Sequence, residues 1–177
     1  KTNKEKIDYF NSLSIYDHNL EILNSYNKIN LVPFGEFLPF ENILKKFGLS
    51  VITNNYQSFS NGDDRKIIKI KKDDFSLKIL PLICYEIIYS GKIFKNQSFD
   101  LIVNISEDGW FGASIGPKQH FAHSIFRAVE SGKYLLRSAN NGIAAIVNPL
   151  GVVEQKVEYG EAGYVDFKKA KKIPPTL

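Results

Sequence analysis

Cys84 is the only cysteine of this chain, and it lies within the apolar run at residues 80–88. A buried strand that stops at Cys84 and continues as an apolar, possibly helical segment would hold the thiol on a sharp turn, where a substrate can reach it. A thiol of this kind needs a base to act as a nucleophile, because only a few per cent of free cysteine is ionised at neutral pH. A lone cysteine is otherwise a common core residue, so the rest of the sequence must decide between the two interpretations.

Three groups of polar residues share one context, since each lies at or just beyond the end of an apolar strand pattern. They are Lys28 with Glu36, Cys84 with Glu86, and the segment 104–110. Strand ends are where clefts form in open α/β sheets. A lysine held near the thiol would stabilise the oxyanion of an acyl-transfer reaction, and Glu36 or Glu86 could hold that lysine in place.

Each of these residues also has a plainer interpretation. Lys28 can be a solvated strand lysine, and Glu36 can bind the amides of its own loop. Glu86 is harder to dismiss, because a buried carboxylate in an apolar run needs a partner. His120 and His123 are separated by one helical turn, but without a third ligand we expect capping or surface roles for them and no metal or cofactor. A Cys–His hydrolase stays open, although no Asn or Asp supports either histidine at a recognisable spacing.

Composition and charge narrow the class of protein. The 177 residues suffice for one domain with a substantial core, and the net charge of +4 comes from largely interspersed residues. No nucleic-acid motif is present, and no apolar run approaches the roughly 18 residues of a membrane helix. Methionine is absent throughout, so we expect this chain to be an internal piece of a longer protein.

The hydrophobic pattern predicts an α/β fold with mixed strands and outer helices. Loops are expected at residues 33–36, 53–64 and 106–112. A short amphipathic helix is expected at 40–47 and a longer one from Pro117 onward, with Phe121 and Ala128 on its apolar side. Strands are expected at residues 14–17, 21–31, 66–71, 77–83, 101–105, 134–138, 143–148, 152–157 and 163–167.

Several motifs in the right order resemble the nitrilase, or carbon-nitrogen hydrolase, superfamily. The lysine segment is Tyr26-Asn27-Lys28 with residues 31–36, the nucleophile segment is Ile83-Cys84-Tyr85-Glu86, and the following strand and loop cover 104–112. Finer features are similar to the apolipoprotein N-acyltransferase family within it. These are Trp110-Phe111-Gly112, Ser114-Ile115-Gly116-Pro117, Gln119-His120-Phe121, Arg127-Ala128 with Glu130, Leu135-Leu136-Arg137-Ser138 and Asn140-Asn141-Gly142-Ile143.

The resemblance implies a nitrilase-like α-β-β-α sandwich, incomplete at the N-terminus and covering residues 1–177, with a Glu-Lys-Cys catalytic set. Cys84 takes the nucleophile role and Lys28 the lysine role, and Glu36 and Glu86 match additional functional acidic positions. Tyr85 matches the residue beside the nucleophile, where turn amides help to bind the oxyanion. For Trp110 and Phe111 we expect contacts with acyl chains or the membrane interface, with ordinary aromatic core as the alternative.

One departure from the family pattern concerns the general base. The glutamate of the family lies much farther upstream of the lysine than this chain reaches, and neither Glu5 nor Glu21 sits in its motif. We therefore expect the base and the flanking membrane helices to lie outside this chain, and the chain alone to be inactive.

The function implied is transfer of a fatty acyl group from a phospholipid to the N-terminal diacylglyceryl-cysteine of a lipoprotein, through a thioester on Cys84. The expected location is the bacterial inner membrane, with the catalytic domain on the periplasmic side. A soluble nitrilase-type amidase that hydrolyses a carbon-nitrogen bond is the first alternative. A non-catalytic binding module that kept the fold is the second.

Overall fold

The structure is a computed structural model that describes residues 7–40, 46–47, 58–72, 75–91, 93, 98–168 and 174–175. The helix expected at 40–47 and the first part of the loop expected at 53–64 lie almost wholly outside these residues. The rest of that loop, residues 58–64, is irregular as expected.

Six strands form the main sheet, in the order β3-β4-β5-β6-β7-β8. The three central strands β4, β5 and β6 run parallel, and the flanking strands pair antiparallel. The bounds are β3 Ile68–Lys72, β4 Phe75–Ile83, β5 Leu101–Glu107, β6 Tyr134–Asn140, β7 Ala144–Val147 and β8 Val153–Val157. Parallel strands end at one edge of a sheet, so the ends of β4 and β5 bring their following residues together.

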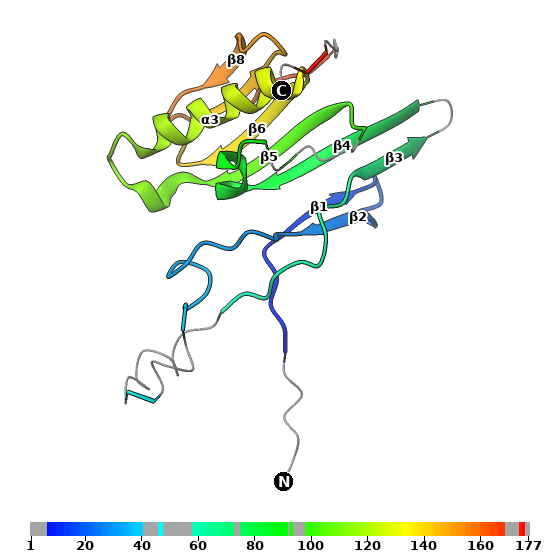
Figure 1. Ribbon diagram of the computed structural model, residues 1–177. Helices are drawn as coiled ribbons and strands as arrows, with labels where there is room; N and C mark the ends of the chain where they lie inside the picture. Colours follow the sequence, from blue (N-terminus) through cyan, green and yellow to red (C-terminus); the bar gives the residue numbers. More distant parts are fainter. Residues whose placement is uncertain are drawn as a thin grey trace.

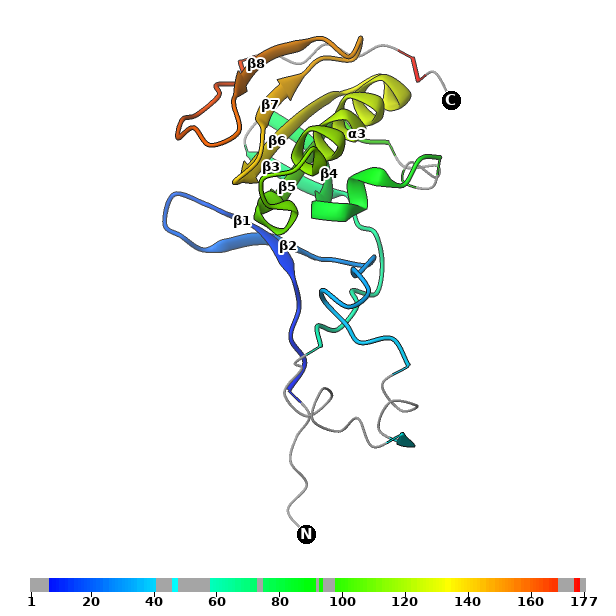
Figure 2. The same ribbon diagram turned by 90° about the vertical axis from the view of Figure 1, so that its left-hand side faces the viewer.

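The main sheet is covered on both faces (Figures 1 and 2). Helix α3, Gly116–Ser131, packs on one face, where Phe121 and Ala128 join a buried cluster with Leu82, Ile102 and Leu135. On the other face lies a two-stranded antiparallel sheet of β1, Ser12–Tyr16, and β2, Ile22–Asn27. The second cluster, which includes Leu13, Tyr26, Ile79 and Ile146, fills the space between the two sheets. The α/β class and the nitrilase-like layering predicted from the sequence are confirmed.

Two strand predictions need correction. The segment 163–167 is not a strand, because the side chain of Gln155 replaces the ladder by bonding both the amide and the carbonyl of Asp166. Strand β2 ends at Asn27, before its predicted end, because the amides of Ile29 and Asn30 bind the carboxylate of Glu86, which lies just after β4, as described below.

Candidate active site

Cys84 sits on the turn between β4 and the short 3₁₀ helix η1, Cys84–Ile88. Its φ angle is 51°, in the left-handed region that costs a residue other than glycine about 1–2 kcal/mol. The neighbouring Ile83 and Ile87 are buried, whereas Cys84 is only partly so. Cys84 thus lies on a sharp turn, as expected, in a conformation that the surroundings must impose.

Glu86 is the residue that fixes this turn to the smaller sheet. It is fully buried, and its Oε2 accepts a hydrogen bond of 2.9 Å from the Ile83 amide. Its Oε1 accepts bonds from the Tyr26 hydroxyl at 2.7 Å and from the Ile29 amide at 3.1 Å. Burial, reinforced by the charge of Glu86, raises the pKa of the Tyr26 phenol well above its usual range. Glu86 therefore has the partners that its place in an apolar run required.

Two further donors reach the same carboxylate oxygen. The Asn30 amide and Arg65 Nη2 both lie 3.2 Å from Glu86 Oε1. Glu86 does not line the cavity described below. The structure thus separates the two carboxylates that the sequence offered as partners of Lys28, since Glu86 binds the turn and the end of β2 instead.

Lys28 follows β2 directly and is 1% exposed, which rules out a solvated strand lysine. Its ammonium donates to both carboxylate oxygens of Glu36, at 2.9 and 2.7 Å. Glu36 also accepts from the Val32 amide at 2.8 Å and from Asn11 Nδ2 at 2.7 Å. Glu36 thus binds an amide of its own loop, as the plainer interpretation expected, and it also binds the ammonium of Lys28.

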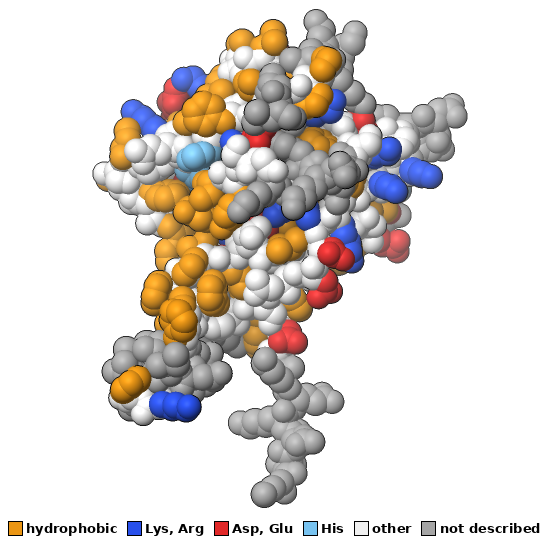
Figure 3. Space-filling model, viewed as in Figure 1, with side chains coloured by type: hydrophobic (Ala, Val, Ile, Leu, Met, Phe, Trp, Pro, Cys, Tyr) orange, Lys and Arg blue, Asp and Glu red, His pale blue; other side chains and the backbone are white. Residues whose placement is uncertain are grey.

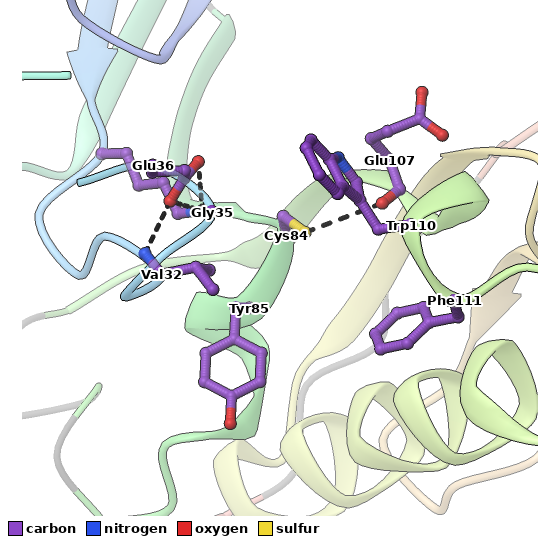
Figure 4. A pocket seen from close by; sticks show the side chains of 9 residues that line it. Val32, Gly35, Glu36, Cys84, Tyr85, Glu107, Trp110 and Phe111 are labelled. Carbon is purple, nitrogen blue, oxygen red and sulfur yellow. Dashed lines mark hydrogen bonds and ion pairs between the residues drawn. The ribbon is translucent and has the colours of Figure 1, made fainter. Parts of the chain in front are cut away.

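A cavity of about 180 Å³ joins these groups (Figure 4). Cys84 lies between the loop that carries Val32 and Glu36 on one side and the aromatic side chains after β5 on the other. Apart from Lys28, Glu36 and Glu107, the side chains that line it are mostly apolar or aromatic. The full lining is Lys28, Val32, Gly35, Glu36, Cys84, Tyr85, Glu107, Trp110 and Phe111. Six of the seven predicted site residues thus line one cavity. The seventh, Glu86, lies outside the lining and binds the backbone of the Cys84 turn.

Neither carboxylate of this cavity is placed to take the thiol proton. Glu36 is occupied by Lys28, and the side chain of Glu107 points away from Cys84 to bind Asn140 and the Gly109 amide. The thiol instead makes a weak hydrogen bond, 4.0 Å long, to the Glu107 carbonyl oxygen. Among the described residues, the lining offers a thiol and a cation but no free carboxylate.

Trp110 and Phe111 belong to the 3₁₀ helix η2, Asp108–Phe111, which follows β5. Trp110 is 78% exposed, so ordinary core packing does not explain it. Phe34 and Ile115 are also exposed. In Figure 3 hydrophobic side chains gather on the side of the molecule where the loop between β5 and α3 faces the loop after β2. Trp110 also lines the cavity, so its exposed ring forms an apolar edge of the cavity, here called the apolar entrance.

The surface or capping role expected for His120 is wrong, because this side chain is 3% exposed. Its Nδ1 lies 2.8 Å from Asp108 Oδ1, and Arg137 Nη2 donates to Asp108 Oδ2 at 2.7 Å. Arg137 also binds Asn104. The sequence contained a sign of this network, because Asn104 and Arg137 each interrupt an apolar strand. Polar side chains buried in this way need hydrogen-bond partners, which could have been sought in neighbouring elements. His123 is partly buried beside Phe126, and no group of described residues could hold a metal ion.

A family model described as carbon-nitrogen hydrolase matches residues 1–166. The chain belongs to the carbon-nitrogen hydrolase family. The resemblance drawn from the lysine and cysteine segments is therefore confirmed.

Relatives with curated names give a more specific likeness than the family model does. The apolipoprotein N-acyltransferase of Bradyrhizobium diazoefficiens is 39% identical over 169 residues, which are 95% of this chain and 31% of that protein. That of Rickettsia prowazekii is 40% identical over 179 residues, with 100% of this chain and 35% of that protein covered. This carbon-nitrogen hydrolase chain thus spans about a third of the length of these relatives.

Solved structures agree on the fold. An amidase double mutant from Nesterenkonia sp. AN1 in complex with acrylamide superposes with a TM-score of 0.55 at 16% identity, covering 84% of this chain and 51% of that one. Another mutant of that amidase, with the acetamide moiety of fluoroacetamide on its active-site cysteine, gives 0.52 at 17% identity, with the same coverage. At such low identity the likeness shows the carbon-nitrogen hydrolase fold alone. In the described part of the chain, no helix is long and apolar enough to cross a bilayer.

Proposed function

We propose that the protein containing this chain is an N-acyltransferase. It moves a fatty acyl group from a membrane phospholipid to the α-amine of an N-terminal diacylglyceryl-cysteine on a lipoprotein. The observation that carries the proposal is the strained turn that presents Cys84 to a cavity shared with the Lys28–Glu36 pair. The names of the curated relatives support the choice of acyl transfer.

In the first half of the reaction the Cys84 thiolate attacks the carbonyl carbon of the phospholipid ester. Lys28 and the turn amides beside Tyr85 stabilise the negative charge that develops on the carbonyl oxygen. The ester bond then breaks, and the lysophospholipid leaves with the proton that the base took from the thiol. The product is a thioester on Cys84.

In the second half the free lipoprotein amine attacks that thioester. The carbon–sulfur bond breaks, an amide forms, and the proton lost by the amine returns to the thiol. The acceptor enters after the first product leaves, so the kinetics are ping-pong. Glu36 acts by fixing the position of the Lys28 ammonium, and Glu86 by fixing the turn.

We propose that the general base is a glutamate outside this chain, because both carboxylates of the cavity lining are already bound to other groups and neither Glu5 nor Glu21 sits in the motif of the family's base. The 177-residue chain expressed alone should therefore show no Cys84-dependent turnover. Measurable turnover would contradict this part of the proposal.

The apolar entrance supports a lipid substrate and work at a membrane surface. Exposed Trp110 and partly buried Phe111 flank the cavity, and aromatic side chains suit the boundary between lipid and water. We place the site at the periplasmic face of the bacterial inner membrane, where the lipoprotein acceptor would meet it. The amidase alternative requires the same cysteine and lysine but no apolar entrance.

The deciding experiment is an intact-protein mass spectrum of the full-length protein after incubation with phospholipid and no acceptor. We expect a fatty-acyl mass on Cys84 that neutral hydroxylamine removes and that Cys84→Ala lacks. A folded protein with no adduct, but with hydrolysis of short amides, would identify an amidase. A folded protein with neither activity would identify a binding module.

A further inference from the structure

A buried polar group lies behind the nucleophile turn and has no part in the chemistry described above. It consists of Asp108 from η2, His120 from α3 and Arg137 from β6, which are 0%, 3% and 2% exposed. Arg137 and Asn104 occupy paired positions on β6 and β5, so their side chains face α3 together. The group thus joins the sheet, the helix and the loop behind Cys84.

His120 is the member that touches the turn. Its Nε2 lies 3.2 Å from the backbone carbonyl oxygen of Cys84. A carbonyl oxygen only accepts hydrogen bonds, so an attractive contact requires a proton on Nε2. The contact is to the backbone and not to the sulfur, which separates His120 from the base of a Cys–His hydrolase.

The opposite side of the ring is fixed by Asp108. Burial alone would raise the pKa of this carboxyl, but the His120 hydrogen bond, the charge of Arg137 and the Ser106 hydroxyl hold it below its usual value. Asp108 is therefore ionised, and its Oδ1 lies 2.8 Å from Nδ1. Arg137 Nη2 holds the other carboxylate oxygen at 2.7 Å, and it also lies 3.2 Å from Nδ1. The imidazole ring has little freedom to turn.

We infer that His120, oriented by Asp108 and Arg137, is a positioning residue that holds Cys84 in its left-handed conformation by donating from Nε2 to the Cys84 carbonyl oxygen. The left-handed conformation costs energy, so the backbone before and after Cys84 must be held in place. On the N-terminal side of Cys84, Glu86 accepts a hydrogen bond from the Ile83 amide. On the C-terminal side, His120 contacts the carbonyl oxygen of Cys84 itself. The inference rests on the proposed role of Cys84 as nucleophile, but its test does not need an acyl donor.

The test compares two amide substitutions in the full-length protein. In His120→Gln the amide nitrogen falls near the place of Nε2 and can still donate to the Cys84 carbonyl. In His120→Asn it falls near the place of Nδ1 and can reach only Asp108. His123→Gln, one turn further along α3, is the matched control, because the ring of this residue packs beside Phe126 on the same helix.

The readout is the rate of iodoacetamide alkylation at Cys84, measured by peptide mass spectrometry at neutral pH. Alkylation needs the sulfur to face the cavity, where the reagent reaches it, so the rate should fall when the turn no longer holds Cys84 in that position. We expect His120→Asn to react about 10-fold more slowly, and His120→Gln and His123→Gln to stay within about 3-fold of wild type. An unchanged or faster rate in His120→Asn, or an equally slow His120→Gln, would overturn the inference.

A second measurement needs no variant and covers the case in which the substitutions prevent folding. Nitrogen-15 spectra of the histidine side chains report which ring nitrogens carry a proton. We expect a proton on His120 Nε2, and a bare Nε2 would overturn the inference. If the alkylation pattern holds while phospholipid leaves no adduct on Cys84, the positioning role stands and the acyltransferase proposal falls.

Discussion

Glu36 holds the ammonium of Lys28 with both carboxylate oxygens, at 2.9 and 2.7 Å, while Lys28 is almost fully buried. The pair is itself tied to the chain by Asn11 and the Val32 amide. A buried charge with this many bonds has a fixed position, which is what stabilisation of a transient oxyanion requires.

Lys28→Arg keeps the positive charge but should lower the rate of Cys84 acylation at least 100-fold. A planar guanidinium is larger and directs its donors differently from an ammonium held as a point charge. The measurement is the rate of thioester formation on the full-length protein. Lys156→Arg, at an exposed surface pair with Glu158, is the control and should leave the rate unchanged. A Lys28→Arg variant as fast as the control would show that this lysine does not stabilise the oxyanion.

The left-handed backbone of Cys84 gives an unusual order of stabilities among inactive variants. Cys84→Gly should be more stable than Cys84→Ala by about 1 kcal/mol, because glycine adopts positive φ without a Cβ clash. At an ordinary strand or helix position the order would be reversed. Chemical denaturation of the two variants measures the difference, and an equal or reversed order would contradict the strain assigned to this turn.

Glu86→Gln should lower the free energy of unfolding by about 3 kcal/mol, as expected when a buried charged acceptor loses its charge. The amide nitrogen of glutamine cannot accept the bonds that reach one of the two carboxylate oxygens. Glu154→Gln is the control, since this exposed side chain accepts from the Tyr134 hydroxyl and can still do so as an amide. Similar losses in both variants would mean that Glu86 does not hold the turn.

Asp108 should make the protein sensitive to acid. Its pKa is lower in the folded chain than in the unfolded one, mainly because the His120 and Arg137 contacts outweigh burial. Its contribution to stability is therefore complete above the ordinary pKa of about 4 and is lost as the pH falls from that value through the lower pKa of the folded state. Asp108→Asn should flatten the fall in unfolding free energy between about pH 5 and pH 3. Asp64→Asn, at an exposed position, is the control and should leave this fall unchanged. An equal dependence of unfolding free energy on pH in the wild type and both variants would rule out the linkage.

The strands around the site could be predicted from the sequence because each is a continuous apolar run bounded by turn residues. Residues 77–83 and 101–105 read directly as buried strands, and both are parallel members of the sheet. Cys84 could be singled out because it follows such a run, and Lys28 because its segment resembles the lysine segment of the carbon-nitrogen hydrolase superfamily. The prediction of a strand at 163–167 was wrong because the Gln155 side chain, and not a neighbouring strand, binds the backbone of this segment. A single side-chain partner of this kind leaves no periodic signal in the sequence.

Other parts of the site depend on contacts between distant segments. The burial of Lys28 requires Glu36 and Asn11, and the left-handed turn requires Glu86 and His120 on its two sides. His120 looked like a surface residue because its partner Asp108 lies in a loop at no characteristic spacing. Helical periodicity shows which face of α3 is buried, but not that a polar residue there meets a partner from the sheet.

The carboxylate of Glu86 has a mechanical consequence. Its two oxygens join the end of β4 in one sheet to the end of β2 in the other, and Lys28 is the residue that follows β2. The thiol and the cation thus lie on different layers, and Glu86 adds a polar link to the apolar cluster that packs the two sheets together. A slip of about 1 Å between the layers would be enough to cost on the order of 100-fold in rate. On warming, the enzyme should therefore lose its activity before either sheet loses its strands.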